Sequence, residues 1–287
     1  MNNKSIAKYL SRILVRISPN YCAEKLKNPF FIIGPGRSGT TLLVHSLAKH
    51  KDVASYYNEA NELWHPNTYP WHTSKYQDFV PPFWVDSKEF TNVSLKHLSP
   101  SQAEMIRSMF GAYQWIIGKH CFLNKSAMIT FMIPFILEKF PDARFIHIIR
   151  DGRAVAFSYA KKQTEKIKSN IEAYDGKGYK LSFNKILMAC AKNWKEHIEE
   201  VETQKRKLGL EARGIIFELR YEDFCLEPCR VLSQIASFMG IKTNGLQSKD
   251  FLNIKNANHK YREQLSKEAI YELTQIMEPS LKEKGYT

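Results

Sequence analysis

The sequence predicts an α/β fold of three layers, in which helices flank a central, mainly parallel sheet. Short apolar runs rich in aromatic and β-branched residues occur at intervals along the chain, as buried parallel strands do. Stretches with helical spacing follow these runs, so strands and helices alternate. The first run ends at a glycine cluster, residues 34–41, that leads directly into a helix. This join between a strand and a helix is typical of anion-binding α/β folds.

The predicted strands are short and follow in chain order. They are FFIIG at 30–34, VASYY from Val53 to Tyr57, RFIHII at 144–149, and a strand within GIIFELRYEDF at 214–224. Helices are predicted over residues 40–50, 131–140, 150–162, 180–208 and 229–241. Gly240 marks the end of the last of these helices.

Residues 1–28 are predicted as a basic amphipathic N-terminal helix that precedes a single domain of residues 29–287. Within residues 1–18, apolar side chains recur at helical spacing and a basic side chain recurs at every fourth position. These side chains are Ile6, Leu10, Ile13, Leu14 and Ile17, and Lys4, Lys8, Arg12 and Arg16. Such a helix packs on its own domain or docks on an anionic membrane surface, and the pattern leaves both interpretations open.

The domain contains an insertion at about residues 60–120 that is rich in Pro, Trp, Tyr and Ser. Its prolines disfavour long regular elements early in the segment. They are Pro66, Pro70, Pro81, Pro82 and Pro100. We expect an irregular segment that covers a substrate site.

The charge of the chain predicts an anionic partner. Its 42 basic and 29 acidic residues give a net charge of +13, which suits nucleic acid, acidic lipid or a multiply charged nucleotide. Five scattered cysteines without paired spacing indicate reduced thiols, and no secretory signal or apolar run of about 20 residues is evident. These features favour the cytoplasm, with contact to the inner membrane surface if the first helix docks there.

The segment GPGRSGTT at residues 34–41 predicts a phosphate-binding loop, because its backbone amides face the N-terminus of a helix. Its glycines also satisfy the dinucleotide pattern G-x-G-x-x-G, with Glu59 about 20 residues later. The spacing matches the nucleoside-triphosphate loop as well, except that Thr40 stands where a lysine is required. A 5′ group shorter than a triphosphate therefore fits better, with Arg37 supplying charge.

Two motifs in this order resemble the superfamily of sulfotransferases that use 3′-phosphoadenosine 5′-phosphosulfate (PAPS). GPGRSGTTL resembles its 5′-phosphosulfate loop, and RFIHIIRDGRAVAFS resembles its 3′-phosphate segment. The likeness is greater to the tyrosylprotein and bacterial branches than to the cytosolic small-phenol branch. It implies a P-loop-like fold and sulfuryl transfer from PAPS, as co-substrate, to an acceptor hydroxyl without a metal ion. No nucleic-acid partner is expected.

The resemblance assigns the donor-binding residues. The 5′-phosphosulfate loop comprises Gly36, Arg37, Ser38, Gly39, Thr40 and Thr41, and the 3′-phosphate is held by Arg150 and by Ser158 eight residues later. Arg153 is expected to assist them. LRYEDF resembles a segment whose tyrosine contacts the nucleotide, which indicates Tyr221. HKYREQL resembles a C-terminal cofactor-binding stretch, which indicates Lys260.

The catalytic residues implied are Lys125, Arg37 and Glu59. LNKSAM at 123–128 resembles the segment with the family's catalytic lysine, although Ala127 stands where proline is frequent. Cations at Lys125 and Arg37 would offset the charge that develops on the leaving phosphate. Glu59 lies just past the second predicted strand and is the preferred base, with Glu62 and His120 as alternatives.

Two other functions remain open from the sequence. A P-loop phosphotransferase would bind ATP and require magnesium, whereas a non-catalytic membrane adaptor would bind the nucleotide without turnover. The acceptor is a hydroxyl of a carbohydrate, a lipid-linked sugar, a peptide or a small alcohol, and no motif selects among these.

Overall fold

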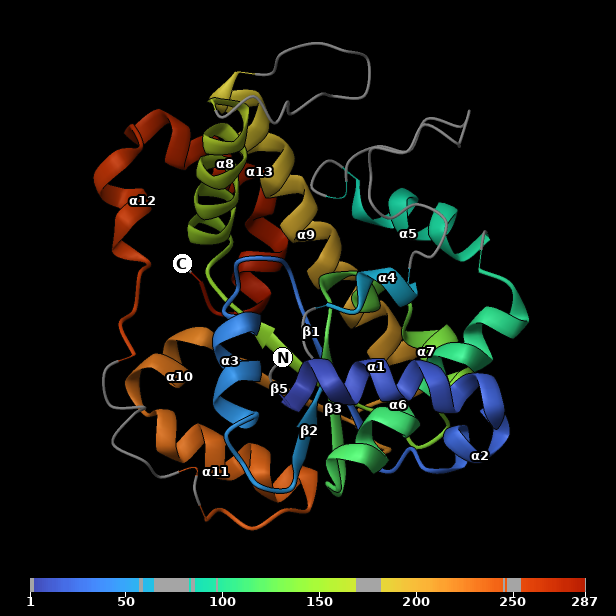
Figure 1. Ribbon diagram of the computed structural model, residues 1–287. Helices are drawn as coiled ribbons and strands as arrows, with labels where there is room; N and C mark the ends of the chain where they lie inside the picture. Colours follow the sequence, from blue (N-terminus) through green and yellow to red (C-terminus); the bar gives the residue numbers. More distant parts are fainter. Residues whose placement is uncertain are drawn as a thin grey trace.

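The computed structural model describes residues 3–56, 59–64, 83, 86–96, 98–168, 182–244, 246 and 254–286. Its centre is a five-stranded sheet in which every pair of neighbouring strands is parallel (Figure 1). The strands are β1 (Pro29–Ile33), β2 (Val53–Ser55), β3 (Cys121–Lys125), β4 (Arg144–Ile149) and β5 (Ile216–Arg220). They lie in the order β2-β3-β1-β4-β5, which places β1 at the centre.

The predicted α/β fold with a central parallel sheet is confirmed, and one strand was missed. The four predicted strands overlap β1, β2, β4 and β5, although β1 begins one residue earlier, at Pro29, and Tyr57 lies outside the described residues. The missed strand, β3, lies between β2 and β1. Its sequence, CFLNK, has no β-branched residue and ends in two polar ones, so its composition did not predict a buried strand.

Each face of the sheet buries its own hydrophobic cluster, because side chains alternate along every strand. On β1, Phe30 and Ile32 join one cluster, while Phe31 and Ile33 join the other. The first cluster is covered by α3 (Thr40–Leu47), α10 (Tyr221–Leu226) and α11 (Pro228–Met239). The second is covered by α1 (Asn3–Ile17), α2 (Pro19–Glu24), α6 (Pro100–Ile117) and α7 (Ile133–Lys139).

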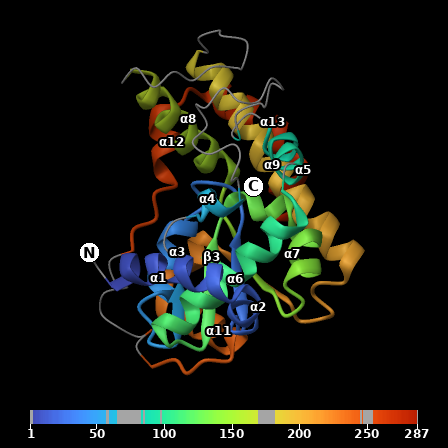
Figure 2. The same ribbon diagram turned by 45° about the vertical axis from the view of Figure 1, so that its right-hand side comes forward.

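A third group of helices lies beyond the ends of the strands. It comprises α8 (Gly152–Lys168), α9 (Phe183–Leu208), α12 (His259–Gln264) and α13 (Lys267–Glu283), with a hydrophobic cluster of its own. In both ribbon views α8, α9 and α13 lie above the sheet as one layer (Figures 1 and 2). The predicted helices at 150–162, 180–208 and 229–241 correspond to α8, α9 and α11, and Gly240 caps α11 in a left-handed conformation.

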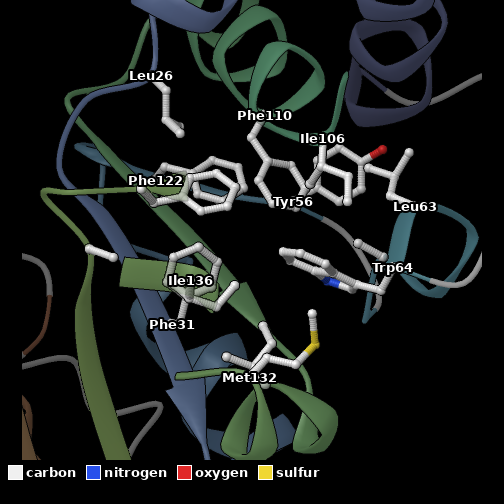
Figure 3. Packing of buried hydrophobic residues seen from close by; sticks show 14 of the residues in the cluster. Leu26, Phe31, Tyr56, Leu63, Trp64, Ile106, Phe110, Phe122, Met132 and Ile136 are labelled. Carbon is white, nitrogen blue, oxygen red and sulfur yellow. The ribbon is translucent and has the colours of Figure 1, made fainter. Parts of the chain in front are cut away.

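Aromatic packing anchors the segment that follows β2 to the sheet (Figure 3). Phe110 lies 4.5 Å from Phe122 between ring centroids, and Trp64 lies 5.6 Å from Phe110. The indole Nε1 of Trp64, in α4 (Asn61–Trp64), donates to Asn124 Oδ1 on β3 at 3.3 Å. These contacts fix residues 59–64 beside the carboxyl ends of the strands.

Within the predicted N-terminal helix of residues 1–28, the described residues 3–28 are part of the core and form two helices instead of one. Pro19 has no N–H to continue α1, and it begins α2 at a position that tolerates proline. Ala7, Val15 and Cys22 are buried in the cluster that α6 and the sheet share. The packing interpretation of this segment is therefore the one that the structure supports for its inner face. Among the described residues, no helix is both long and apolar enough to cross a membrane.

The predicted irregular insertion is largely helical where the structure describes it. Residues 87–96 form α5 (Ser87–Lys96), and residues 100–117 form α6. Pro100 lies in the first turn of α6, where proline is compatible with a helix, and Ser99 and Gln102 form a reciprocal capping box. The other four prolines of the insertion lie outside the described residues.

Gly111→Ala is expected to lower the stability of the protein. A Cβ at this position would lie 2.0 Å from the carbonyl oxygen of Cys22, because α2 crosses α6 there. Alanine in a free helix would gain about 1 kcal/mol, so a loss of about 1–3 kcal/mol would show that the crossing decides the outcome. Denaturant unfolding measures the change, with Glu104→Ala on the exposed side of α6 as control. A stabilised Gly111→Ala variant would contradict the observed crossing.

Candidate functional site

The predicted site residues gather where the parallel strands end. Gly34 follows β1, Lys125 is the last residue of β3, Arg150 follows β4, and Tyr221 follows β5. Because all these strands run in one direction, their carboxyl ends meet at the same edge of the sheet. Ligands of open α/β sheets bind at this edge.

The phosphate loop between β1 and α3 has a strained but well-supported backbone. Arg37 adopts a φ of 73°, in the left-handed region, and Gly39 adopts 94° as the N-cap of α3. A Cβ at Gly39 would lie 2.6 Å from the ring of Tyr221, so only glycine fits this position. The N–H of Gly34 donates to Thr130 Oγ1 at 3.2 Å, which ties the loop to the segment after β3.

The loop presents hydroxyl groups and amides at the N-terminus of α3. Ser38 is completely buried, and within the described part of the chain its Oγ has no hydrogen-bond partner. Thr40 is buried and Thr41 is exposed in the first turn of the helix. A buried hydroxyl without a partner is costly unless a ligand satisfies it. The loop residues therefore fit an anionic group such as a phosphosulfate.

Arg150 bridges the loop and the nucleotide side of the site. Its Nη1 donates to the carbonyl oxygen of Arg37 at 2.9 Å, and its Nε donates to Asn258 Oδ1 at 2.8 Å. The guanidinium carbon lies 4.4 Å from the ring centroid of Tyr221, a cation–π contact. Burial lowers the pKa of Arg150, and burial raises the pKa of Tyr221 to about 12. The tyrosine is therefore neutral beneath the charged guanidinium.

A cavity of about 350 Å³ opens beside Arg150. It is lined by Arg37, Arg150, Ala154, Phe157, Ser158, Lys161, Lys162, Glu165, Ala257 and Lys260. Arg37 Nε donates to Ser158 Oγ at 3.2 Å across this cavity. The lining has five cationic side chains against one carboxylate, which suits a multiply charged anion. Arg37, Arg150, Ser158 and Lys260, four of the predicted site residues, are thus brought together around one cavity.

Glu59 and Lys125 form an ion pair at the adjacent part of the strand edge. Lys125 Nζ donates to Glu59 Oε1 at 2.5 Å. The side chain of Lys125 is 12% exposed and that of Glu59 is 41% exposed, so the carboxylate is the member open to a second molecule. Lys125 pairs in register with Ile32, two residues before the phosphate loop begins. The pair therefore lies next to the loop.

The two alternative bases are placed differently. Glu62 is paired with Lys8 of α1, with 3.4 Å between Nζ and Oε1, which directs its carboxylate toward the N-terminal helix. His120 precedes β3 and is exposed at the amino end of that strand. Lys125 is at the carboxyl end, about 16 Å away at roughly 3.3 Å per residue. Of the three candidates, only Glu59 contacts the predicted catalytic lysine.

Arg153, which was expected to assist the 3′-phosphate residues, is engaged by the carboxylate of Asp151. Its Nε and Nη2 donate to the two carboxylate oxygens of Asp151 at 3.0 and 3.1 Å, and the pair is buried. A bidentate pair of this kind fixes the turn between β4 and α8.

Three residues near the site were missed from the sequence. Glu222 was not among the predicted site residues, but it accepts hydrogen bonds from Asp151 N and Asn258 Nδ2. Its place directly after Tyr221 was an available signal, whereas Asn258 had none. Tyr159 closes over the loop, because a Cβ at Gly36 would lie 2.7 Å from its ring. Among the described residues, no three His, Cys, Asp or Glu side chains gather in a group that could hold a metal ion.

Residues 29–245 match the model of the sulfotransferase family. The chain belongs to the sulfotransferase family. The matched part of the chain includes the phosphate loop, the Glu59–Lys125 pair, Arg150, Ser158 and Tyr221. It ends before Lys260.

Curated relatives of the chain include a protein-tyrosine sulfotransferase from Drosophila melanogaster and protein-tyrosine sulfotransferase 1 from Danio rerio. Each is 25% identical to the chain, over 79% and 75% of its length respectively. The chain spans only 41% and 53% of these two relatives.

Solved structures with the same fold include sulfotransferase STF9 from Mycobacterium avium, with a TM-score of 0.62 and 15% identity. That likeness covers 95% of this chain and 80% of the STF9 chain. The sulfotransferase domain from the curacin biosynthetic pathway has a TM-score of 0.56 and 18% identity, and covers 91% of this chain and 99% of that one. These likenesses confirm the P-loop-like fold.

We expect 3′-phosphoadenosine 5′-phosphate (PAP) to bind the chain far more tightly than adenosine monophosphate, because the cations that line the cavity beside Arg150 favour a ligand with a second phosphate. Arg150→Ala should weaken PAP binding by about 2–4 kcal/mol, the usual effect of losing a charge-assisted contact. Titration calorimetry measures both. Arg144→Ala is the matched control, since Arg144 stands at the opposite end of β4 and donates to Phe238 O. Equal affinities for the two nucleotides would contradict the assignment.

Proposed function

We propose that the chain transfers a sulfuryl group from PAPS to an acceptor hydroxyl, with Glu59 as base. The observation that carries this proposal is the contact of Glu59 with Lys125 beside the phosphate loop. A half-exposed carboxylate and a nearly buried ammonium group together offer a proton acceptor and a fixed positive charge. Sulfuryl transfer needs both at one place.

The donor would be held at two points. The loop from Gly36 to Thr41 supplies amides and hydroxyl groups for the 5′-phosphosulfate, and the unpartnered Ser38 Oγ supports that role. Arg150, Ser158 and Lys260 line the cavity for the 3′-phosphate. The donor supplies an activated sulfuryl group. Fixing both ends of the nucleotide orients that group, which is a large part of catalysis by proximity.

The reaction exchanges one bond to sulfur for another. The acceptor oxygen forms the new S–O bond, while the bond from sulfur to the bridging oxygen of the nucleotide breaks with its electron pair left on the phosphate. Glu59 takes the proton of the acceptor hydroxyl. Lys125 and Arg37 offset the negative charge that develops on the leaving phosphate.

The alternatives have less support. A nucleoside-triphosphate phosphotransferase would need a lysine in the loop where Thr40 stands, in the first turn of α3. A non-catalytic adaptor would have no use for a paired carboxylate and lysine beside the loop.

The acceptor carries a hydroxyl group. Because the two relatives named above are protein-tyrosine sulfotransferases, a tyrosyl peptide is the first acceptor to test. Carbohydrate and lipid-linked hydroxyls are the alternatives. The segment that was expected to cover the acceptor, residues 60–120, contributes α4 beside Glu59.

We also propose that the outer face of α1 contacts a membrane surface from the cytoplasmic side. Ten large hydrophobic side chains are exposed among the described residues, and eight of them lie on α1, α2 and α6. On α1 they are Ile6, Tyr9, Leu10, Ile13 and Ile17. They occupy a different side of the helix from the buried Ala7, Ser11 and Val15.

The surroundings of this apolar face suit an anionic lipid surface. Arg12 and Arg16 follow one edge of it, about one helical turn apart. Tyr21 and Trp115 pack edge to face nearby, with 5.8 Å between ring centroids, and Lys25 lies over the Tyr21 ring. Exposed amphipathic aromatics beside basic groups are typical of membrane interfaces.

Glu59→Gln should preserve donor affinity and lower turnover by a factor of about 10²–10⁴, the range for loss of a general base. Turnover is measured with sulfur-labelled donor and a panel of tyrosyl peptide, carbohydrate and small-alcohol acceptors. Glu62→Gln is the matched control, because its carboxylate pairs with Lys8 of α1, away from Lys125. Near-normal turnover in Glu59→Gln would remove Glu59 from the role.

Replacing Ile13 and Ile17 together by aspartate should weaken binding to phosphatidylglycerol-containing vesicles by about tenfold or more, because both side chains enter the interface. Vesicle sedimentation measures binding, with phosphatidylcholine vesicles as the uncharged comparison. Leu226→Asp is the control, since Leu226 is exposed on α10. Unchanged sedimentation of the double variant would contradict the membrane contact.

A further inference from the structure

The guanidinium of Arg150 is held from behind by a chain of hydrogen bonds that ends near the C-terminus. Arg150 Nε donates to Asn258 Oδ1 at 2.8 Å, and Asn258 Nδ2 donates to Glu222 Oε1 at 2.6 Å. We infer that Glu222, acting through Asn258, is the residue that positions Arg150 for the 3′-phosphate. This inference rests on the proposed function of the site.

The chain of contacts has only one favourable polarity. A guanidinium can only donate and a carboxylate can only accept, so the amide between them must present its oxygen to Arg150 and its nitrogen to Glu222. The observed contacts follow this pattern. Asparagine is suited to this position because its amide both accepts and donates, and the two charged ends fix its orientation.

Both oxygens of the Glu222 carboxylate are occupied. Oε1 also accepts from Asp151 N at 3.1 Å, and Oε2 accepts from the hydroxyl of Tyr286 at 2.8 Å. The guanidinium of Arg220 lies over the Tyr286 ring at 4.3 Å and holds it against the carboxylate. Burial raises the pKa of Tyr286, so its hydroxyl stays protonated and donates. Glu222 is therefore fixed by three separate segments of the chain.

The backbone beneath Arg150 is fixed as well. Trp194 Nε1 donates to the carbonyl oxygen of Arg150 at 3.1 Å. The neighbouring Asp151 carboxylate is engaged by Arg153 and does not pair with Arg150. Asn258 accepts from Nε of Arg150, and the Arg37 carbonyl accepts from its Nη1. Within the described residues no hydrogen bond uses Nη2 of Arg150, whose side chain lines the cavity.

This arrangement reduces the entropy that is lost when a nucleotide binds. A free arginine side chain has many rotamers, and fixing it on binding costs affinity. Here the cost is met by the fold before the ligand arrives. The benefit applies only to a ligand with a 3′-phosphate, because Arg150 and Ser158 face that group. Glu222 and Asn258 should therefore raise the affinity ratio of PAP over adenosine monophosphate without contacting either nucleotide.

Titration calorimetry with PAP and with adenosine monophosphate tests the inference on the full chain. Asn258→Ala and Glu222→Leu should each weaken PAP binding by about tenfold or more and change adenosine monophosphate binding by less than about twofold. The double variant should be no weaker than the worse single variant, because both changes break one chain of contacts. Glu222→Gln should retain most of the affinity, since its amide oxygen still accepts from Asn258.

Glu218→Gln is the control for a merely structural effect. Glu218 is also a carboxylate of this region, on β5, but it pairs with His147, Lys205 and Lys284 and has no contact with Arg150 among the described residues. This variant should lower the melting temperature and leave the affinity ratio unchanged. If Glu222→Leu does not fold, Asn258→Ala and Tyr286→Phe provide the same comparison.

The outcomes separate this inference from the function on which it rests. If the wild-type chain binds PAP and adenosine monophosphate equally, the proposed function fails. If the wild type prefers PAP and Asn258→Ala and Glu222→Leu keep that preference, only the positioning role of Glu222 is overturned. Additive losses in the double variant would likewise overturn it, because independent contacts would then be involved.

Discussion

The parallel pairing of β1 with both β3 and β4 brings three separate segments to one edge of the sheet. The phosphate loop leaves β1 there, Lys125 ends β3 there, and Arg150 begins the turn after β4. If neighbouring strands were antiparallel, the carboxyl end of β1 would lie at the opposite edge from those of β3 and β4. The hydrogen bond from Gly34 N to Thr130, and that from Arg150 to the Arg37 carbonyl, then join the segments across the strand ends.

Cations crowd this edge, and the fold stabilises them in several ways. Arg150 stacks on Tyr221 and donates to a carbonyl and an amide oxygen, while Lys125 has a carboxylate partner. Glu59 balances the charge of Lys125, but the partners of Arg150 are neutral, so they offset part of the cost of desolvating its guanidinium without neutralising it. The positive potential is thus retained for an anionic ligand. The aromatic core around Trp64 also supports this edge of the sheet, because it holds the segment with Glu59 in place.

The sequence predicted those parts of the site that depend on residues close together along the chain. Strands β1, β4 and β5 and the glycine loop were predicted from short apolar runs and from the glycine or polar residues that end them. Strand β3 escaped prediction because its identity depends on the two strands that flank it, and α6 escaped because Pro100 was interpreted as a breaker although it starts the helix. Asn258 was beyond reach, since its partners Glu222 and Arg150 lie 36 and 108 residues away along the chain, whereas Glu222 directly follows the predicted Tyr221.

Lys8 lies on the inner side of α1 and reaches α4, next to Glu59. Its ammonium group contacts Glu62 and lies 4.2 Å from the ring centroid of Tyr56, three residues before Glu59. A lipid surface that holds α1 and a substrate that settles beside α4 would therefore act on a shared set of contacts. By thermodynamic linkage, if the lipid surface changes the free energy of substrate binding, the substrate changes the free energy of membrane binding by the same amount. Occupancy of the acceptor site would then change the lifetime of the protein on a membrane. Where the coupling is favourable, each acceptor that binds would prolong the search for further acceptors along that surface.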